Sequence, residues 1–132
     1  MNPVSKDIAD HLVESSSGFS LVQGTDLFIG QEPNSPDKCV TVYDRPGLPP
    51  EVIDVVYDKP GFMVRVRGEK NDYAGAYAIA QSIKTYLHKI TDTTINSTRY
   101  IQILVTGDVN FVKYDTNNRP VFTLNFLCHR SS

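Results

Sequence analysis

The sequence lacks the features of several large protein classes. It contains no apolar stretch near the roughly 18 residues that a transmembrane helix needs. It starts without the basic and apolar segments of a secretory signal, so we expect no membrane partner. Its 13 Lys and Arg stand against 15 Asp and Glu, a formal net charge of −2. Domains that mainly bind nucleic acid are usually strongly basic, so the near-neutral charge disfavours a nucleic-acid-binding domain.

The motifs of common catalytic and metal sites are also absent. There is no Cys-x-x-Cys, no His-Glu-x-x-His and no glycine-rich phosphate loop. His88 and Asp92 could share a helix face, but two ligands alone make a poor metal site. Asp44 and Asp58 could be imagined as a catalytic carboxylate pair, although nothing in the sequence brings them together. We therefore expect no enzyme, no cofactor and no metal.

The sequence contains only two cysteines, and a chain of this length does not need a disulfide to stabilise its core. Without a secretion signal, Cys39 and Cys128 are predicted to be reduced, half-buried small hydrophobic residues. A chain of 132 residues can bury about two-thirds of its unfolded surface and needs no disulfide to hold a core. With 40% hydrophobic and 21% charged residues, the composition predicts one globular domain over residues 1–132.

The hydrophobic pattern predicts two helices and six strands. The first helix is expected from its capping residue Ser5 to about Ser16, and the second from Asn71 or Asp72 to Ile90. The strands are expected at 27–29, 39–43, 62–67, 98–105, 109–114 and 121–128. This order predicts an α+β fold in which the helices pack against one sheet.

A proline-rich segment interrupts the predicted strands. Residues 30–61 hold six of the eight prolines and only one short predicted strand, which predicts a long structured loop. Within it, Tyr43-Asp44-Arg45-Pro46-Gly47 recurs fourteen residues later as Tyr57-Asp58-Lys59-Pro60-Gly61. Pro-Gly is the central pair of a type II turn. The repetition indicates either two chain reversals that join strands or two rigid corners that present Tyr and a basic side chain to a partner.

Two candidate surfaces follow from these patterns. Prolines limit the freedom of a loop and so lower the cost of ordering it against a neighbour. The candidate interface residues are Tyr43, Arg45, Pro46, Gly47, Pro49, Pro50, Tyr57 and Lys59. Arg65 and Arg67 share a strand face with Lys70 close behind. They predict either a solvated face of the sheet or a basic strip that meets an acidic partner or lines a passage for DNA.

Several segments together carry a family resemblance. They are 24–30, 43–50, 59–68 and the ending Arg119-Pro120-Val121-Phe122-Thr123-Leu124-Asn125-Phe126. These segments resemble the phage minor capsid protein family, whose members resemble the tail-terminator, or tail-completion, proteins of long-tailed phages. The ending is similar to the closing strand of that family. The resemblance spans about residues 5–130.

The resemblance implies a fold and a role. The implied fold is a single mixed, mostly antiparallel sheet with two helices packed on one face, here with a long Pro-rich loop. The implied role is a structural virion protein whose ring, usually a hexamer, caps the tail tube and joins it to the head connector. Its partners would be copies of itself, the tail tube protein and neck proteins, with DNA passing through without sequence recognition.

The implied location is the tail-neck region of the virion, and the host cytoplasm during assembly. Two alternatives stay open at this point. The first is another neck component, such as a head-closure or connector-associated protein. The second is a small nucleic-acid-binding module that uses Arg65, Arg67 and Lys70.

Overall fold

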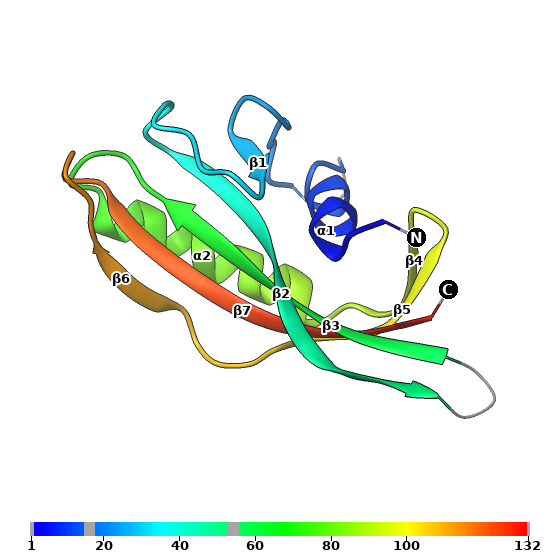
Figure 1. Cartoon of the computed structure of the whole chain (residues 1–132). Helices are drawn as coiled ribbons and strands as arrows, with labels where there is room; N and C mark the ends of the chain where they lie inside the picture. Colours follow the sequence, from blue (N-terminus) through cyan, green and yellow to red (C-terminus); the bar gives the residue numbers. More distant parts are fainter. Residues whose placement is uncertain (1, 15–17, 53–55, 132) are drawn as a thin grey trace.

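A computed structural model describes residues 2–14, 18–52 and 56–131, with the backbone alone at 50–52 and 56–57. Within these residues the chain forms two helices and a seven-stranded sheet (Figure 1). The elements are α1 (Val4–Leu12), β1 (Leu27–Ile29), β2 (Cys39–Val52), β3 (Val56–Arg67), α2 (Tyr73–His88), β4 (Thr91–Ile95), β5 (Thr98–Val105), β6 (Asn110–Tyr114) and β7 (Pro120–Ser131). The predicted α+β class is confirmed. Neither helix is long and apolar enough to cross a bilayer.

The sheet is mixed and mostly antiparallel. Its strands follow the order β1-β2-β3-β7-β5-β4, with β6 paired to β7. Only the β1–β2 pair is parallel among the described strands. β5 pairs with the far end of β7, at 126–131, and β6 pairs with its near end, at 120–123. β5 and β6 therefore share one edge of β7, while β3 occupies the other edge.

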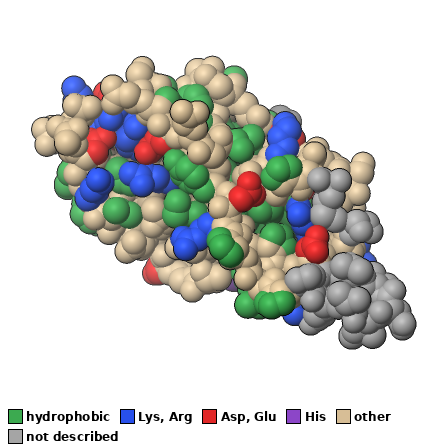
Figure 2. Space-filling view, in the orientation of Figure 1, with side chains coloured by type: hydrophobic (Ala, Val, Ile, Leu, Met, Phe, Trp, Pro, Cys, Tyr) green, Lys and Arg blue, Asp and Glu red, His purple; other side chains and the backbone are tan. Residues whose placement is uncertain are grey.

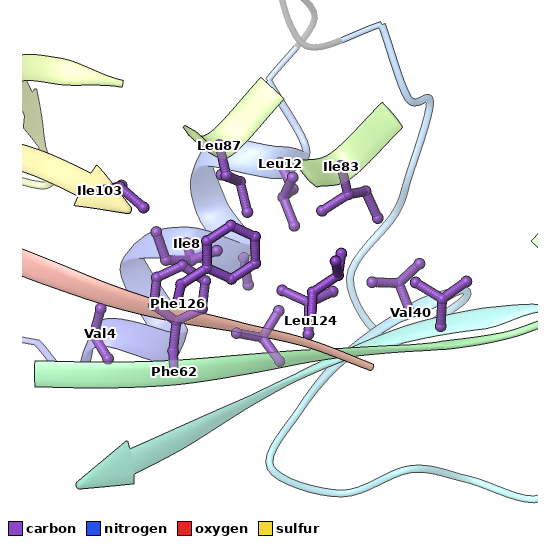
Figure 3. Packing of buried hydrophobic residues seen from close by; sticks show 14 of the residues in the cluster. Val4, Ile8, Leu12, Val40, Phe62, Ile83, Leu87, Ile103, Leu124 and Phe126 are labelled. Carbon is purple, nitrogen blue, oxygen red and sulfur yellow. The ribbon is translucent and has the colours of Figure 1, made fainter. Parts of the chain in front are cut away.

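One hydrophobic core joins both helices to the sheet. α1 packs on β1 and β2, and α2 packs on β7 and β5. Leu12 of α1 meets Ile83 and Leu87 of α2 above the inward side chains of β3 and β7 (Figure 3). Phe62 and Phe126 are register partners whose rings stack at 4.8 Å. Alternate residues of β3 and β7 enter this core, as the period of two in the sequence predicts.

The helix boundaries are partly as predicted. α2 begins where expected, because the Asp72 carboxylate accepts a hydrogen bond from the Gly75 amide at 3.0 Å. The prediction for α1 is wrong at both ends. α1 starts at Val4 with Pro3 as its N-cap and ends at Leu12, so Ser5 lies inside the helix and does not cap it.

One strand, β4, was not predicted from the sequence. β4 reads Thr-Asp-Thr-Thr-Ile and buries only Ile95. It pairs with β5 at the edge of the sheet. An edge strand that contributes one side chain to the core carries no hydrophobic alternation, so sequence periodicity cannot find it.

The predicted long loop with Pro-Gly turns is wrong. β2 and β3 run through most of the proline-rich segment, and only residues 30–38 connect β1 to β2 as irregular chain. Gly47 and Gly61 lie inside these strands, and neither has the positive φ of a type II turn. Arg45 pairs with Gly61 and Leu48 with Lys59, with a register shift between them. The two Pro-Gly pairs therefore face each other at a β-bulge, where missing ladder hydrogen bonds are tolerated.

Candidate assembly interface

The outer parts of β2 and β3 form a hairpin that extends from one end of the sheet (Figure 1). We call residues 44–52 and 56–61 the arm. β1 pairs only with residues 40–42 of β2, so along 44–52 the outer edge of β2 has no neighbouring strand among the described residues. On the other side, β3 pairs with residues 127–131 of β7, which ties the arm to the sheet. The arm is thus anchored along one edge and open along the other.

Two hollows lie beside the arm on the face of the sheet away from the core. The first, about 190 Å³, is lined by Leu48 and Lys59 of the arm and by Leu104 and Leu127 of the sheet. The second, about 250 Å³, is lined by Arg45 and Pro46 with Gly61, Thr106, Asn125 and Leu127. Leu48 is 54% exposed, and Leu104 is also exposed. This surface exposes leucines beside Arg45 and Lys59, and so combines an apolar centre with a polar rim, as protein interfaces do.

The two glycines of the arm permit a close approach of its strands. A Cβ on Gly47 would lie 1.8 Å from the Lys59 carbonyl oxygen, and one on Gly61 would lie 3.0 Å from the Pro46 carbonyl oxygen. Real side chains do not tolerate the first of these contacts. Glycine at position 47 is therefore required by the approach of two backbones, not by a turn conformation.

The other predicted interface residues differ in how far their side chains are buried. The Arg45 guanidinium lies over the sheet and donates to Asn125 Oδ1 at 2.7 Å. Tyr43 is half-buried, and burial, reinforced by the charge of Glu32, raises the pKa of its hydroxyl. Pro46 and Pro49 are exposed. The side chains of Pro50 and Tyr57 lie outside the part of the chain whose side chains the structure describes.

The predicted basic strip is not an open surface. Arg65 Nε lies 3.0 Å from Glu32 Oε2. Arg67 is only 4% exposed and donates to the carbonyl oxygens of Pro36 and Asp37 at 2.6 and 2.9 Å. Lys70 is exposed and follows β3 without joining these contacts. The two arginines therefore hold the 31–38 loop instead of facing a partner together with Lys70.

A third arginine, for which the sequence predicted no site role, holds the same loop in place. Arg119 is 3% exposed, and its Nη1 donates to the Asn34 carbonyl oxygen at 2.6 Å. It also pairs with Asp115 at 2.8 Å and with Asp37 at 3.2 Å. With Arg67, it gives an irregular loop the hydrogen bonds that regular structure would otherwise supply.

In the part of the chain that the structure describes, charged side chains of both signs are interspersed, and the two candidate carboxylates do not come together. In Figure 2, Lys and Arg lie among hydrophobic and acidic side chains, without a block of one sign. Asp44 binds Ser5 and Asp58 faces Arg130, so the two carboxylates have separate partners. Within the described residues, no group of three or more His, Cys, Asp and Glu side chains is placed to hold a metal ion. Cys39 and Cys128 are free, as predicted, but fully buried where the sequence predicted half-buried residues. Burial raises the pKa of the Cys128 thiol to about 12.

Comparison with known proteins decides the family. A family model described as bacteriophage tail terminator protein matches residues 17–131. The chain belongs to this family. The resemblance predicted from the sequence is confirmed, and this tail terminator family member is a structural protein of the phage tail.

The fold of this family member recurs in a solved particle. It is similar to a chain of the structure titled "Virion of native gene transfer agent (GTA) particle", with a TM-score of 0.61 and 15% sequence identity. The similarity covers 83% of this chain and 81% of that chain. No curated protein matches the sequence.

Two residues of the candidate interface, Leu104 and Leu127, were not predicted, although the sequence contained a signal for them. Leu104 follows buried Ile103 on β5, and Leu127 follows buried Phe126 on β7. Neighbouring residues of a strand point to opposite faces. Apolar residues at both positions therefore indicate that the outer face is partly apolar as well.

Proposed function

We propose that this tail terminator family member forms a hexameric ring that caps the tail tube and joins it to the head connector. The observation that carries the proposal is the arm, which exposes Leu48 beside a hollow lined by Leu104 and Leu127. Its partners are copies of itself, the tail tube protein and neck proteins. The mixed charge of the surface in Figure 2 suits contacts with several proteins and lets DNA pass without recognition.

A closed ring needs two different surfaces on each copy, one meeting the other on the next copy. We assign the arm to the first surface. The second is the aromatic patch, defined as the exposed rings of Tyr73, Tyr77, Phe111 and Tyr114, which are 38–45% exposed. These rings come from α2 and β6 and surround buried Phe122.

The positions and the chemistry of the two surfaces support their pairing. The arm pairs with residues 127–131 of β7, and β6 pairs with residues 120–123, so the surfaces lie toward opposite ends of β7. A surface at each end permits head-to-tail contact from copy to copy. The arm exposes Pro46, Leu48 and Pro49, and the aromatic patch exposes rings of the kind that are enriched in protein interfaces.

We expect Leu48→Gln to weaken ring formation at least tenfold, because the substitution places an amide where an apolar side chain is buried on assembly. Ring formation is measured by native mass spectrometry, alone and with purified tail tubes. Val22→Gln is the matched control, since Val22 is 56% exposed, like Leu48 at 54%, but lies outside the arm. If both variants assemble like the unmodified protein, the arm is not the docking element.

We expect the double variant Leu48→Cys and Tyr114→Cys to form a ladder of disulfide-linked oligomers on oxidation. The arm of one copy would bring one thiol to the aromatic patch of the next. The native thiols are buried and do not compete. Each single variant is the control and should give dimers at most. A double variant that forms rings but no ladder beyond the dimer would contradict arm-to-patch docking.

The alternative roles have less support. A nucleic-acid-binding module would need an open basic surface, whereas Arg65 and Arg67 are engaged by the 31–38 loop. Another neck component would use the same arm with a different neighbour. Assembly on isolated tail tubes, as opposed to isolated connectors, distinguishes that role from the proposed one.

A further inference from the structure

We infer that a polar latch between the arm and the start of α1 sets the direction of the arm. The latch consists of Asp44 with Ser5 on the β2 side and of Asp58 with Arg130 on the β3 side. Asp44 and Asp58 are thus positioning residues for assembly. The inference rests on the proposed function, in which the arm docks on the next copy.

On the β2 side the latch consists of two formed hydrogen bonds between Asp44 and Ser5. Asp44 Oδ1 accepts a hydrogen bond from the Ser5 amide at 2.9 Å, and Oδ2 accepts one from the Ser5 hydroxyl at 2.7 Å. The first turn of a helix has free amide groups and favours a negative charge. No side chain caps α1 from its own N-cap, Pro3. The arm therefore supplies the side-chain acceptor that Pro3 cannot offer to the first amides of α1.

On the β3 side Arg130 is bound at the start of α1, but its contact with Asp58 is longer than a hydrogen bond. Arg130 Nη1 donates to the Asn2 carbonyl oxygen and to the Tyr100 hydroxyl, both at 3.1 Å, and lies 3.7 Å from Asp7 Oδ2. Arg130 is thereby tied to the start of α1. Its Nε is buried without a hydrogen-bond partner among the described residues and lies 4.0 Å from Asp58 Oδ2.

A small movement would complete this second contact. A hydrogen bond between a guanidinium and a carboxylate has a length of about 2.8 Å, so the Asp58 oxygen would need to approach Arg130 by about 1 Å. A buried donor without an acceptor favours that approach. Asp44 lies at the base of the arm on β2, and Asp58 lies farther out on β3, between the Leu48–Lys59 and Glu51–Tyr57 pairs. The two contacts together therefore fix the arm at two points along its length.

These contacts are not needed to form the core. The core cluster consists of residues from the helices and the inner part of the sheet, and neither carboxylate belongs to it. The outer edge of the arm has no neighbouring strand among the described residues. The ladder with β7 therefore holds the β3 strand of the arm, and the Asp44–Ser5 contact with α1 holds the β2 strand at its base.

Hydrogen–deuterium exchange of the monomer tests the latch directly. In Asp44→Ala we expect the amides of Arg45, Gly47 and Leu48 to exchange at least fivefold faster, while those of α2 stay unchanged. Asp44→Asn keeps an oxygen for the Ser5 amide and should restore most of the protection. Ring formation should be slowed in Asp44→Ala and largely restored in Asp44→Asn. If Asp44→Ala does not fold, Asp58→Ala takes its place and should show the same increase.

The outcomes separate the latch from the proposed function. Unchanged exchange of the arm in both alanine variants overturns the latch, whether or not rings form. Equal exchange in Asp44→Ala and Asp44→Asn also overturns it, because the oxygen at position 44 would then have no role. Faster exchange in the arm with undiminished ring formation supports the latch and contradicts the docking role of the arm, which Leu48→Gln tests independently.

Discussion

Gly47→Ala is expected to abolish ring formation while leaving the core folded. The added methyl carbon would lie 1.8 Å from the Lys59 carbonyl oxygen, which is backbone and cannot rotate away. The strands of the arm must therefore separate at the bulge. We expect a loss of about 1–3 kcal/mol in the free energy of unfolding, as for other overpacked sites. Urea denaturation measures the stability, and native mass spectrometry measures the assembly.

Gly107→Ala provides the matched control for this variant. A Cβ at Gly107 would meet no atom within 4 Å, and the residue has no positive φ. Such a substitution is neutral or stabilises by up to about 1 kcal/mol, because alanine restricts the unfolded chain. If Gly47→Ala assembles as well as Gly107→Ala, the close approach of the arm strands has no role in the ring.

Asp7→Ala is expected to cost about 3–5 kcal/mol of stability, the range for breaking a buried ion pair. Asp7 is fully buried on α1 and accepts a hydrogen bond from the Tyr100 hydroxyl. It also accepts one from Asn96 at 3.0 Å and lies 3.7 Å from Arg130. Burial, reinforced by Asp7, raises the pKa of the Tyr100 hydroxyl. Without Asp7, a guanidinium and a hydroxyl would remain in the interior with fewer partners.

Asp10→Ala tests whether burial of the carboxylate is the reason for the loss of stability expected in Asp7→Ala. Asp10 lies on the same helix and binds Lys6 at 2.9 Å and Asn96 at 2.8 Å, but its side chain is 26% exposed. Water can replace these partners, so we expect a loss of about 1 kcal/mol or less. Thermal and urea unfolding compare the two variants. A loss in Asp7→Ala no larger than in Asp10→Ala would contradict the buried network.

The parts of the fold that follow from local pattern could be predicted. α2 and β7 were found because alternate or helically spaced apolar residues are those that the core buries, as at Ile83 and Leu124. The start of α2 was found because Asp72 caps it by a contact within three residues. β4 carries only Ile95 into the core and gave no signal.

The parts that depend on distant partners could not be predicted. The Pro-Gly pairs suggest turns when each is considered alone, but each lies opposite the other in a ladder between two strands. Arg67 carries a charge that suggests a solvated or docking face, yet its partners are carbonyl oxygens about 30 residues away in sequence. In both cases tertiary pairing overrode local propensity. Most of the candidate interface residues therefore lie on the arm, in a backbone conformation that the sequence did not predict.

The position of β7 in the sheet has a consequence for synthesis on the ribosome. β7 is the last strand to be made, yet it lies between β3 on one edge and β5 and β6 on the other. Until residues 120–131 leave the exit tunnel, the nascent polypeptide can form only the β2–β3 hairpin, the β4–β5 hairpin and the short β1–β2 pair. In that state β3 and β5 lack β7, the neighbour that they share. The sheet therefore closes after translation of its final strand, and a message cut short before that point yields a chain with open strand edges, the kind of species that aggregates or is degraded.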